Sequence, residues 1–547
     1  MVYTSTYRHT IIVDLLEYLG IVSNTEILQS ACEDKNRKPE YTKKKENKAE
    51  YDVECGADPS SSASSISSGS SKSQIEKSDP FLVYWNGPSD AENPQNWSVP
   101  KKSLVIFQVM LLTCVTYMGS SIYTPGQEYI QEEFHVGHVV ATLNLSLYVL
   151  GYGLGPIIFS PLSEIARYGR LYLYMVTLFF FMIFQVGCAT VHNIGGLIVM
   201  RFISGILCSP SLATGGGTVA DIISPEMVPL ILGMWSAGAV AAPVLAPLLG
   251  AAMVDAKNWR FIFWLLMWLS AATFILLAFL FPETQHHNIL YRRALKLRKE
   301  TGDDRYYTKQ DKIDREMDAR TFFIDTLYRP FKMIIKEPAI LAFDLYIAVA
   351  YGCFYLFFEA FPIVFIGVYH FSLIEVGLAY MGFCVGCVFA YGLFAFLNIR
   401  IIVPRFKNGT FTPEAFLIVA MCVCWSLPLS LFLFGWTARV HWILPVISEV
   451  FFVLAVFNIF QATFAYLATC YPKYVASVFA GNGFCRASFA CAFPLFGKAM
   501  YDNLATKNYP VAWGSSLVGF FTLGLAIIPF ILYKYGPLLR SKSSYAD

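Results

Sequence analysis

The chain has 547 residues, of which 56% are hydrophobic and only 15% are Asp, Glu, Lys or Arg. An ordinary soluble domain carries about 25% charged residues. This composition excludes a soluble enzyme, a disordered scaffold and a nucleic-acid-binding protein. It predicts a polytopic helical membrane protein, whose partner is the lipid bilayer. The net charge of +2 adds little, because lipid-facing surface needs no charge.

The N-terminal region, residues 1–100, is polar and differs from the rest of the chain. Lys and Glu dominate residues 33–54, and serine dominates residues 60–73. Such a segment has too little apolar surface to form a core, so we expect a disordered cytoplasmic tail. Within it, only residues 7–22 have the pattern of a short amphipathic helix.

From residue 101 onward the chain consists of apolar runs near 20 residues, the length that crosses about 30 Å of hydrocarbon. These runs must be helices, because backbone groups in lipid have to be satisfied internally. A charged linker, 282–338, separates an N-terminal half (101–281) from a C-terminal half (339–533), and 534–547 form a tail. The twelve spans are expected near 103–123, 138–159, 171–190, 195–216, 229–253, 261–281, 339–365, 373–397, 414–434, 442–468, 475–499 and 512–533.

The distribution of Lys and Arg predicts the orientation of these spans. If the N-terminus is inside, the inner loops carry Arg167, Arg170, Arg405 and the many basic residues of the linker, whereas the outer loops carry few. We therefore expect both termini in the cytoplasm.

Two six-helix halves joined by a linker indicate a transporter with its site between the halves near the midplane. Such a site is expected to be a large, mostly apolar cavity with few polar anchors, and aromatic side chains there can stack on planar ligands. The candidate cavity residues are Gln108, Tyr117, Asn144, Tyr148, Tyr355, Phe358, Asn458, Gln461 and Arg486.

Charged residues inside spans cost several kcal/mol or more and so need a reason. Arg201 is expected to bias a nearby acid or carbonyl, or else to be a structurally paired arginine. A buried acid whose pKa is raised towards neutral pH could carry a proton, and the candidates are Asp344, Glu359 and Glu449. Glu449 is favoured because it lies about two turns inside its span, and the competing interpretation pairs it with Arg486.

Three short segments contain residues in a motif-like pattern. They are Gly155, Glu164, Gly169 and Arg170 around the loop between spans 2 and 3, Arg201 in span 4, and Gly238, Pro243, Pro247 and Gly250 in span 5. These segments resemble sequence motifs of the major facilitator superfamily, and of its fungal twelve-span drug:proton antiporters in particular. The first resembles an inner-gate motif with two additional residues before Gly169, the second a proton-coupling motif, and the third an antiporter motif with alanine in place of some glycines.

The resemblance implies an all-α major facilitator fold and proton-driven export of hydrophobic toxic compounds, azoles such as fluconazole among them, from the plasma membrane. In the inner gate, a bond between Glu164 and an arginine would hold one state of the cycle. The small residues and prolines of span 5 would form a tight seam between the halves. No metal, cofactor or catalytic residue is expected. Gly215, Gly216 and Gly217 lack the lysine of a phosphate-binding loop, so no nucleotide is expected either.

Two other functions remain open at this stage. A proton-coupled metabolite permease, for a polyamine or a sugar, would import its substrate and line its cavity with specific polar pairs. A non-transporting membrane sensor with this fold would signal through the serine-rich tail and move no protons.

Overall fold

The computed structural model describes residues 9–18, 79–224, 227–316 and 327–545. The described residues form a bundle of long helices and contain no β-strand. Eleven helical segments are long and apolar enough to cross a membrane. A further 30-residue helix, α23 (Val475–Leu504), lies among them and is less apolar, since Arg486 stands near its middle. The observed helices follow the predicted spans to within a few residues at most ends.

The N-terminal half consists of six long helices. They are α5 (Val99–Met118), α7 (His138–Glu164), α8 (Leu171–Thr190), α9 (Ile194–Ile222), α10 (Val228–Ala256) and α11 (Arg260–Leu280), with the short α6 (Gln127–Phe134) between α5 and α7.

The C-terminal half is built from more broken helices. They are α16 (Pro338–Phe361) with a π-turn (Pro362–Ile366), α17 (Leu373–Ala379), α18 (Met381–Leu397) with a π-turn (Asn398–Ile402), α19 (Val403–Lys407), α20 (Ala415–Val423), α21 (Ser426–Thr437), α22 (Ile443–Cys470), α23, α24 (Ala512–Leu525) and α25 (Ile528–Lys542).

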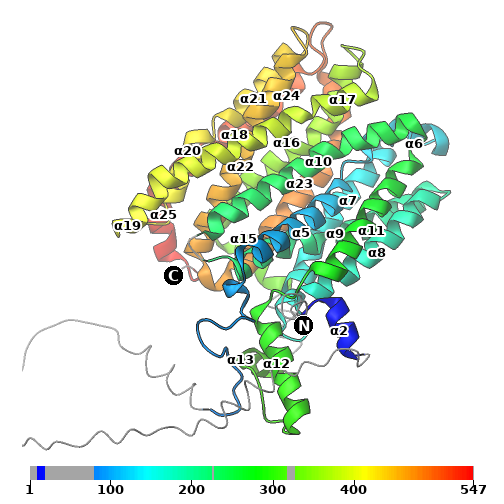
Figure 1. Cartoon of the computed structure of the whole chain (residues 1–547). Coiled ribbons are helices and arrows are strands. Elements are labelled where there is room, and N and C mark those ends of the chain that lie inside the picture. The colour runs from blue at the N-terminus through cyan, green and yellow to red at the C-terminus, as the bar shows by residue number, and fades with distance from the viewer. Residues whose placement is uncertain (1–8, 19–78, 225–226, 317–326, 546–547) are drawn as a thin grey trace, which may run out of the picture.

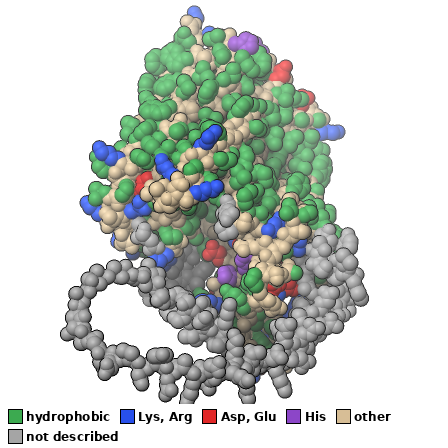
Figure 2. Space-filling view, turned by 60° about the vertical axis from the view of Figure 1, so that its left-hand side comes forward, with side chains coloured by type: hydrophobic (Ala, Val, Ile, Leu, Met, Phe, Trp, Pro, Cys, Tyr) green, Lys and Arg blue, Asp and Glu red, His purple; other side chains and the backbone are tan. Residues whose placement is uncertain are grey.

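The two halves meet along two seams, α7 against α23 and α10 against α17 and α18. In the first seam, the backbone of Gly153 approaches the side chain of Ala487 so closely that a larger residue would clash. One continuous cluster of buried apolar side chains runs through both halves. Hydrophobic side chains also cover much of the outside of the bundle, as expected for a surface that faces lipid (Figure 2).

Both termini and the linker helices lie at the same end of the bundle, which we call the linker end (Figure 1). The linker contains α12 (His286–Thr301), α13 (Lys309–Glu316) and α15 (Arg329–Lys336). The sequence of this stretch indicated only a charged linker, whereas parts of it are helical. Its helices α12 and α13 project away from the bundle.

Parts of the N-terminal region depart from the expected disordered tail. Within the amphipathic helix predicted for residues 7–22, Ile11–Tyr18 form α2, and residues 7–8 and 19–22 lie outside the described residues. Arg293 of α12 forms ion pairs with Asp90 at 2.9 Å and Glu92 at 2.6 Å, and Arg292 pairs with Asp14 at 2.8 Å. The composition of the segment does not show these contacts, because the arginines that pair with its acids belong to the linker. The serine-rich stretch lies outside the described residues.

Candidate substrate and coupling site between the halves

A pocket lies where the two halves meet. Tyr117 of α5 and Val240 of α10 contribute from the N-terminal half. The remaining lining comes from α16 and α22 and consists of Tyr351, Phe354, Phe452, Val453, Val456, Phe457 and Phe460. Its volume is about 20 Å³, room for about one water molecule. The large cavity expected between the halves is not open at this place in this conformation, because aromatic side chains of both halves fill the space.

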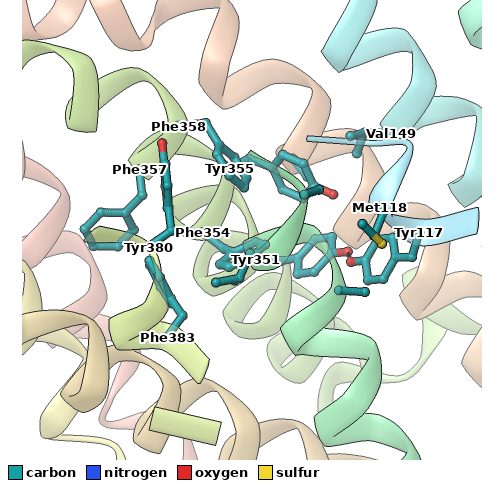
Figure 3. Packing of buried hydrophobic residues seen from close by; sticks show 14 of the residues in the cluster. Tyr117, Met118, Val149, Tyr351, Phe354, Tyr355, Phe357, Phe358, Tyr380 and Phe383 are labelled. Carbon is teal, nitrogen blue, oxygen red and sulfur yellow. Dashed lines mark hydrogen bonds between the residues drawn. The ribbon is translucent and has the colours of Figure 1, made fainter. Parts of the chain in front are cut away.

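Four tyrosine hydroxyls meet beside this pocket and connect the halves. Figure 3 shows three of these tyrosines, Tyr117, Tyr351 and Tyr355. Tyr117 and Tyr351 share a hydrogen bond. Tyr152 of α7 shares a hydrogen bond with Tyr351 at 2.6 Å and donates to Tyr355 at 3.2 Å. The ring of Phe358 packs on Tyr355 with centroids 5.6 Å apart. Among the predicted cavity residues, Tyr117, Tyr355 and Phe358 therefore lie together.

Arg486 lies against the same aromatic group. Its guanidinium carbon is 5.3 Å from the ring centroid of Tyr351 and 5.5 Å from that of Phe460. Its Nε is buried with no hydrogen-bond partner among the described residues. Asp344 interacts electrostatically with Arg486 and accepts a hydrogen bond from the Asn482 amide at 2.7 Å. The structure thus places a cation at the pocket and an acid behind it.

Glu449 lies elsewhere in the C-terminal half. It is fully buried on α22 and accepts a hydrogen bond at 3.0 Å from the backbone N–H of Phe383 on α18. Its other carboxylate oxygen has no hydrogen-bond partner among the described residues. The competing interpretation, in which Glu449 pairs with Arg486, does not match this structure, because α22 turns this acid towards α18.

Glu359 connects the two halves at the end of the bundle opposite the linker. Its Oε2 lies 2.8 Å from Nε2 of His138, the first residue of α7. Since α16 starts at the linker end, its last turn, which carries Glu359, lies at the far end. Sequence reasoning listed Glu359 as an acid but did not find its histidine partner.

Arg201 binds backbone carbonyls in the N-terminal half. It is fully buried and donates to Gly119 O at 2.6 Å, Asn144 O at 3.1 Å and Ser120 O at 3.2 Å. Its guanidinium also lies 4.5 Å from the ring centroid of Tyr148. Arg201 was expected to interact with an acid or a carbonyl, and its partners in the structure are carbonyls. Gly119 O and Ser120 O directly follow α5, and Asn144 O belongs to α7, so the arginine joins these two helices.

The other predicted cavity residues make contacts within one half. Asn144 and Tyr148 both contact Arg201. The Asn144 amide also donates to Ala141 O, and the Tyr148 hydroxyl donates to Thr116 O. Gln108 is buried and faces α11, where its amide lies 3.4 Å from Leu276 O. Asn458 donates to Ala390 O of α18, and Gln461 is partly buried on α22.

The inner-gate residues form a hub at the linker end with partners that the sequence analysis missed. Arg170 pairs with Asp221 at 3.1 Å and donates to Thr214 O at 2.9 Å. The expected bond between Arg170 and Glu164 is not formed, because the arginine turns towards α9. The Glu164 side chain is exposed and forms no ion pair among the described residues, while its backbone carbonyl accepts a hydrogen bond from the Gln285 amide at 2.9 Å.

Glu283 completes this hub, which also includes two predicted glycines. It is fully buried and accepts hydrogen bonds from the backbone N–H groups of Arg170 and Leu171 at 3.2 and 3.1 Å. Gly169 has a φ of +67°, and a side chain there would clash with Glu283. Gly155 packs against Ser209 of α9. Glu283 directly follows Pro282 at the end of the sixth span, and an acid directly after this proline was the available signal in the sequence.

The antiporter-motif residues of α10 face α5 and the turn that directly follows it, rather than the opposite half. A Cβ at Gly250 would lie 2.5 Å from Ile122 O, and a Cβ at Gly238 would lie 3.0 Å from Met110. The carbonyl of Pro243 accepts a hydrogen bond from Ser121, and Pro247 is buried on the same helix. The predicted tight seam is present, but it lies within the N-terminal half. A different face of α10 meets α17 and α18.

A model of the Major Facilitator Superfamily matches residues 109–494. The chain therefore belongs to this superfamily of membrane transporters, as the resemblance predicted. A solved structure of the xylose transporter XylE from E. coli shares the fold, with a TM-score of 0.53 and 13% identity over 80% of this chain and 98% of that chain.

Two curated relatives are much more similar. The chain is 90% identical over 547 residues, all of both chains, to Fluconazole resistance protein 1 of Saccharomyces cerevisiae. It is 65% identical over 480 residues to Multidrug transporter FLR1 of Candida glabrata, covering 88% of this chain and 86% of the relative.

Proposed function

We propose that this chain is a proton-coupled antiporter of the plasma membrane that exports hydrophobic drugs, fluconazole and other azoles among them, by alternating access. The observation that carries this proposal is the apolar, aromatic pocket between the halves. Relatives named for fluconazole resistance and multidrug transport support it. Aromatic faces can stack on planar azole rings, and the tyrosine hydroxyls and Arg486 can donate to ring nitrogens.

Alternating access requires contacts between the halves that break in turn. At the far end, Glu359 and His138 hold α16 to α7. Towards the linker end, Tyr391 of α18 donates to Leu230 O of α10 at 3.3 Å. Rocking of the halves would break one set while the other stays formed, and either motion would widen the pocket. By the distribution of Lys and Arg, the linker end and both termini face the cytoplasm.

Proton coupling is proposed to pass through Asp344 and Arg486. An ionised Asp344 holds the guanidinium by charge, whereas a protonated Asp344 leaves the full positive charge of Arg486 at the pocket. The proton state of the acid thereby changes what a substrate meets beside Tyr351. Glu449, which has no link to the pocket of this kind, serves as the comparison.

A permease for polar metabolites fits this pocket poorly. Polyamines and sugars need several directed polar partners, since hydrogen-bonding groups left unpaired in a buried site are costly. Seven of the nine lining residues named above have wholly apolar side chains. No structural observation favours a sensor without transport.

The test is efflux of preloaded labelled fluconazole from cells that express the chain, with and without a protonophore. Each proton that enters the cell supplies about 2.3 kcal/mol of free energy per 100 mV of membrane potential, which can drive export. We expect energy-dependent efflux that the protonophore abolishes. A correctly localised protein that produces no efflux would remove azole export.

The coupling step is tested by exchange of drug for drug across vesicles that contain the purified protein. Asp344→Asn should retain exchange but lose export driven by a proton gradient. Glu449→Gln provides the comparison and should retain gradient-driven export. The opposite pattern would transfer the coupling role to Glu449.

A further inference from the structure

The linker helix α15 is attached to the C-terminal half along one face only. It packs on α16 and α23 at the linker end. Met333 is fully buried, Ile334 contacts Gly481, and the ring of Phe331 lies 5.2 Å from that of Phe484. These contacts fix the position of the helix and decide which face points outward.

The outward face carries exposed apolar side chains. Four residues at the spacing i, i+4, i+7 and i+8 lie on one side of the helix. They are Tyr328, directly before the helix, and Lys332, Ile335 and Lys336. Ile335 is 80% exposed and Tyr328 is 58% exposed. Unlike the exposed apolar side chains of the spans, these belong to a helix outside the membrane-crossing segments.

The same face is positively charged. The ammonium group of Lys332 lies 6.0 Å from the ring centroid of Tyr328, and Lys336 is exposed. The adjacent acid, Glu337, is buried and accepts hydrogen bonds from Tyr471 at 3.0 Å and Ser543 at 2.8 Å. Its charge is therefore turned inward, and the outward face combines apolar side chains with cations.

The depth of this face in the membrane follows from the chain itself. The membrane span of α16 begins at Pro338, two residues after α15 ends. The exposed face must therefore lie at the boundary between hydrocarbon and water. Figure 1 shows α15 at the lower edge of the bundle, and in Figure 2 Lys and Arg side chains gather at the lower part of the hydrophobic surface.

We propose that the outward face of α15 binds an anionic phospholipid of the membrane leaflet at the linker end. Lys332 and Lys336 contact the headgroup phosphate, while Ile335 and Tyr328 lie among the first acyl carbons. Amphipathic helices with basic and apolar sides lie in this interface, and tyrosine is enriched there. A lipid is favoured over a protein partner because the adjacent span fixes the helix at the bilayer surface.

The test is native mass spectrometry of the purified full chain, titrated with phosphatidylserine or phosphatidylcholine. A lysine near an anionic surface contributes about fivefold in binding. Lys332→Gln/Lys336→Gln is therefore expected to bind phosphatidylserine roughly twenty-five-fold more weakly, with phosphatidylcholine binding unchanged. The matched control is Lys299→Gln/Lys312→Gln, which removes two exposed lysines from α12 and α13, away from the membrane.

Two further variants keep the result interpretable. Lys332→Arg/Lys336→Arg retains the charge and should restore binding, whereas Ile335→Ser retains both lysines and should weaken binding of the intact lipid. Equal binding by the glutamine variant and its control would overturn the proposal. Displacement of the lipid by glycerophosphoserine at equal concentration would also overturn it, because a headgroup without acyl chains would then suffice.

Discussion

At the scale of single residues, the arrangement around Arg201 shows how a charge can be buried in this fold without an acid. Three backbone carbonyls at the end of α5 and the start of α7 accept its hydrogen bonds, and the face of Tyr148 lies beside it. Hydrogen bonds to a charged donor contribute about 1.5–3 kcal/mol each. The guanidinium therefore joins two helices through their backbones.

Replacing Arg201 with Gln should destabilise the protein by about 3 kcal/mol or more, because buried carbonyls would lose their donor. Arg201→Lys should recover only part of this loss, since an ammonium group cannot reproduce the planar fork of donors. The measurement is the melting temperature of the purified protein together with fluconazole efflux. Arg439→Gln, which removes an exposed arginine, is the control and should have little effect. An Arg201→Gln protein with unchanged melting temperature would contradict this account.

At the scale of elements, the motif of α10 acts through its contact with α5. The backbones approach so closely at Gly250 that a methyl group would lie 2.5 Å from a carbonyl oxygen. Small residues permit such close packing of membrane helices. The motif thus determines how α5, which carries Tyr117, is held beside the pocket.

Gly250→Ala should cost about 1–3 kcal/mol, because the added methyl group cannot be accommodated without moving α5. We expect a lower melting temperature and slower drug export. Gly392→Ala is the matched control, since no atom lies within 4 Å of a Cβ built at Gly392. If both substitutions had equally small effects, the close contact would not limit the packing of α10.

At the scale of the whole molecule, the two halves are joined by few polar contacts. Among the described residues, His138 and Glu359 form the one ion pair between the long helices of the two halves. It lies at the far end, where it opposes opening. The tyrosine hydroxyls join the halves near the centre.

His138→Leu and Glu359→Gln should show a coupling of about 0.5–3 kcal/mol in a double-mutant cycle of unfolding, because each removes the same contact. Each single variant should also raise the drug concentration that half-saturates export. Loss of the ion pair at the far end lowers the population of the state that is open to the cytoplasm and binds the drug there. His192→Leu, an exposed histidine at the same end, should combine additively with Glu359→Gln. Additive effects of His138→Leu would show that the pair does not hold the halves together.

The sequence alone determined the membrane class, the positions of the long helices and the division into halves. These properties are local, because a run of about 20 apolar residues must form a helix in lipid whatever its neighbours are. The sequence also located the motif residues, since each motif is a short segment, and their roles stay predictions.

Only the tertiary structure decided which charged residues meet. Arg170 pairs with Asp221 and not with Glu164. Arg486 interacts electrostatically with Asp344, whereas Glu449 accepts its hydrogen bond from a backbone N–H of α18. The closure of the pocket by side chains from both halves was likewise invisible in the sequence. The physical reason is that these helices are apolar on nearly every side, so their sequences do not show which face turns inward. That rotation is fixed by packing between segments far apart in the chain, and it decides the partner of every buried charge.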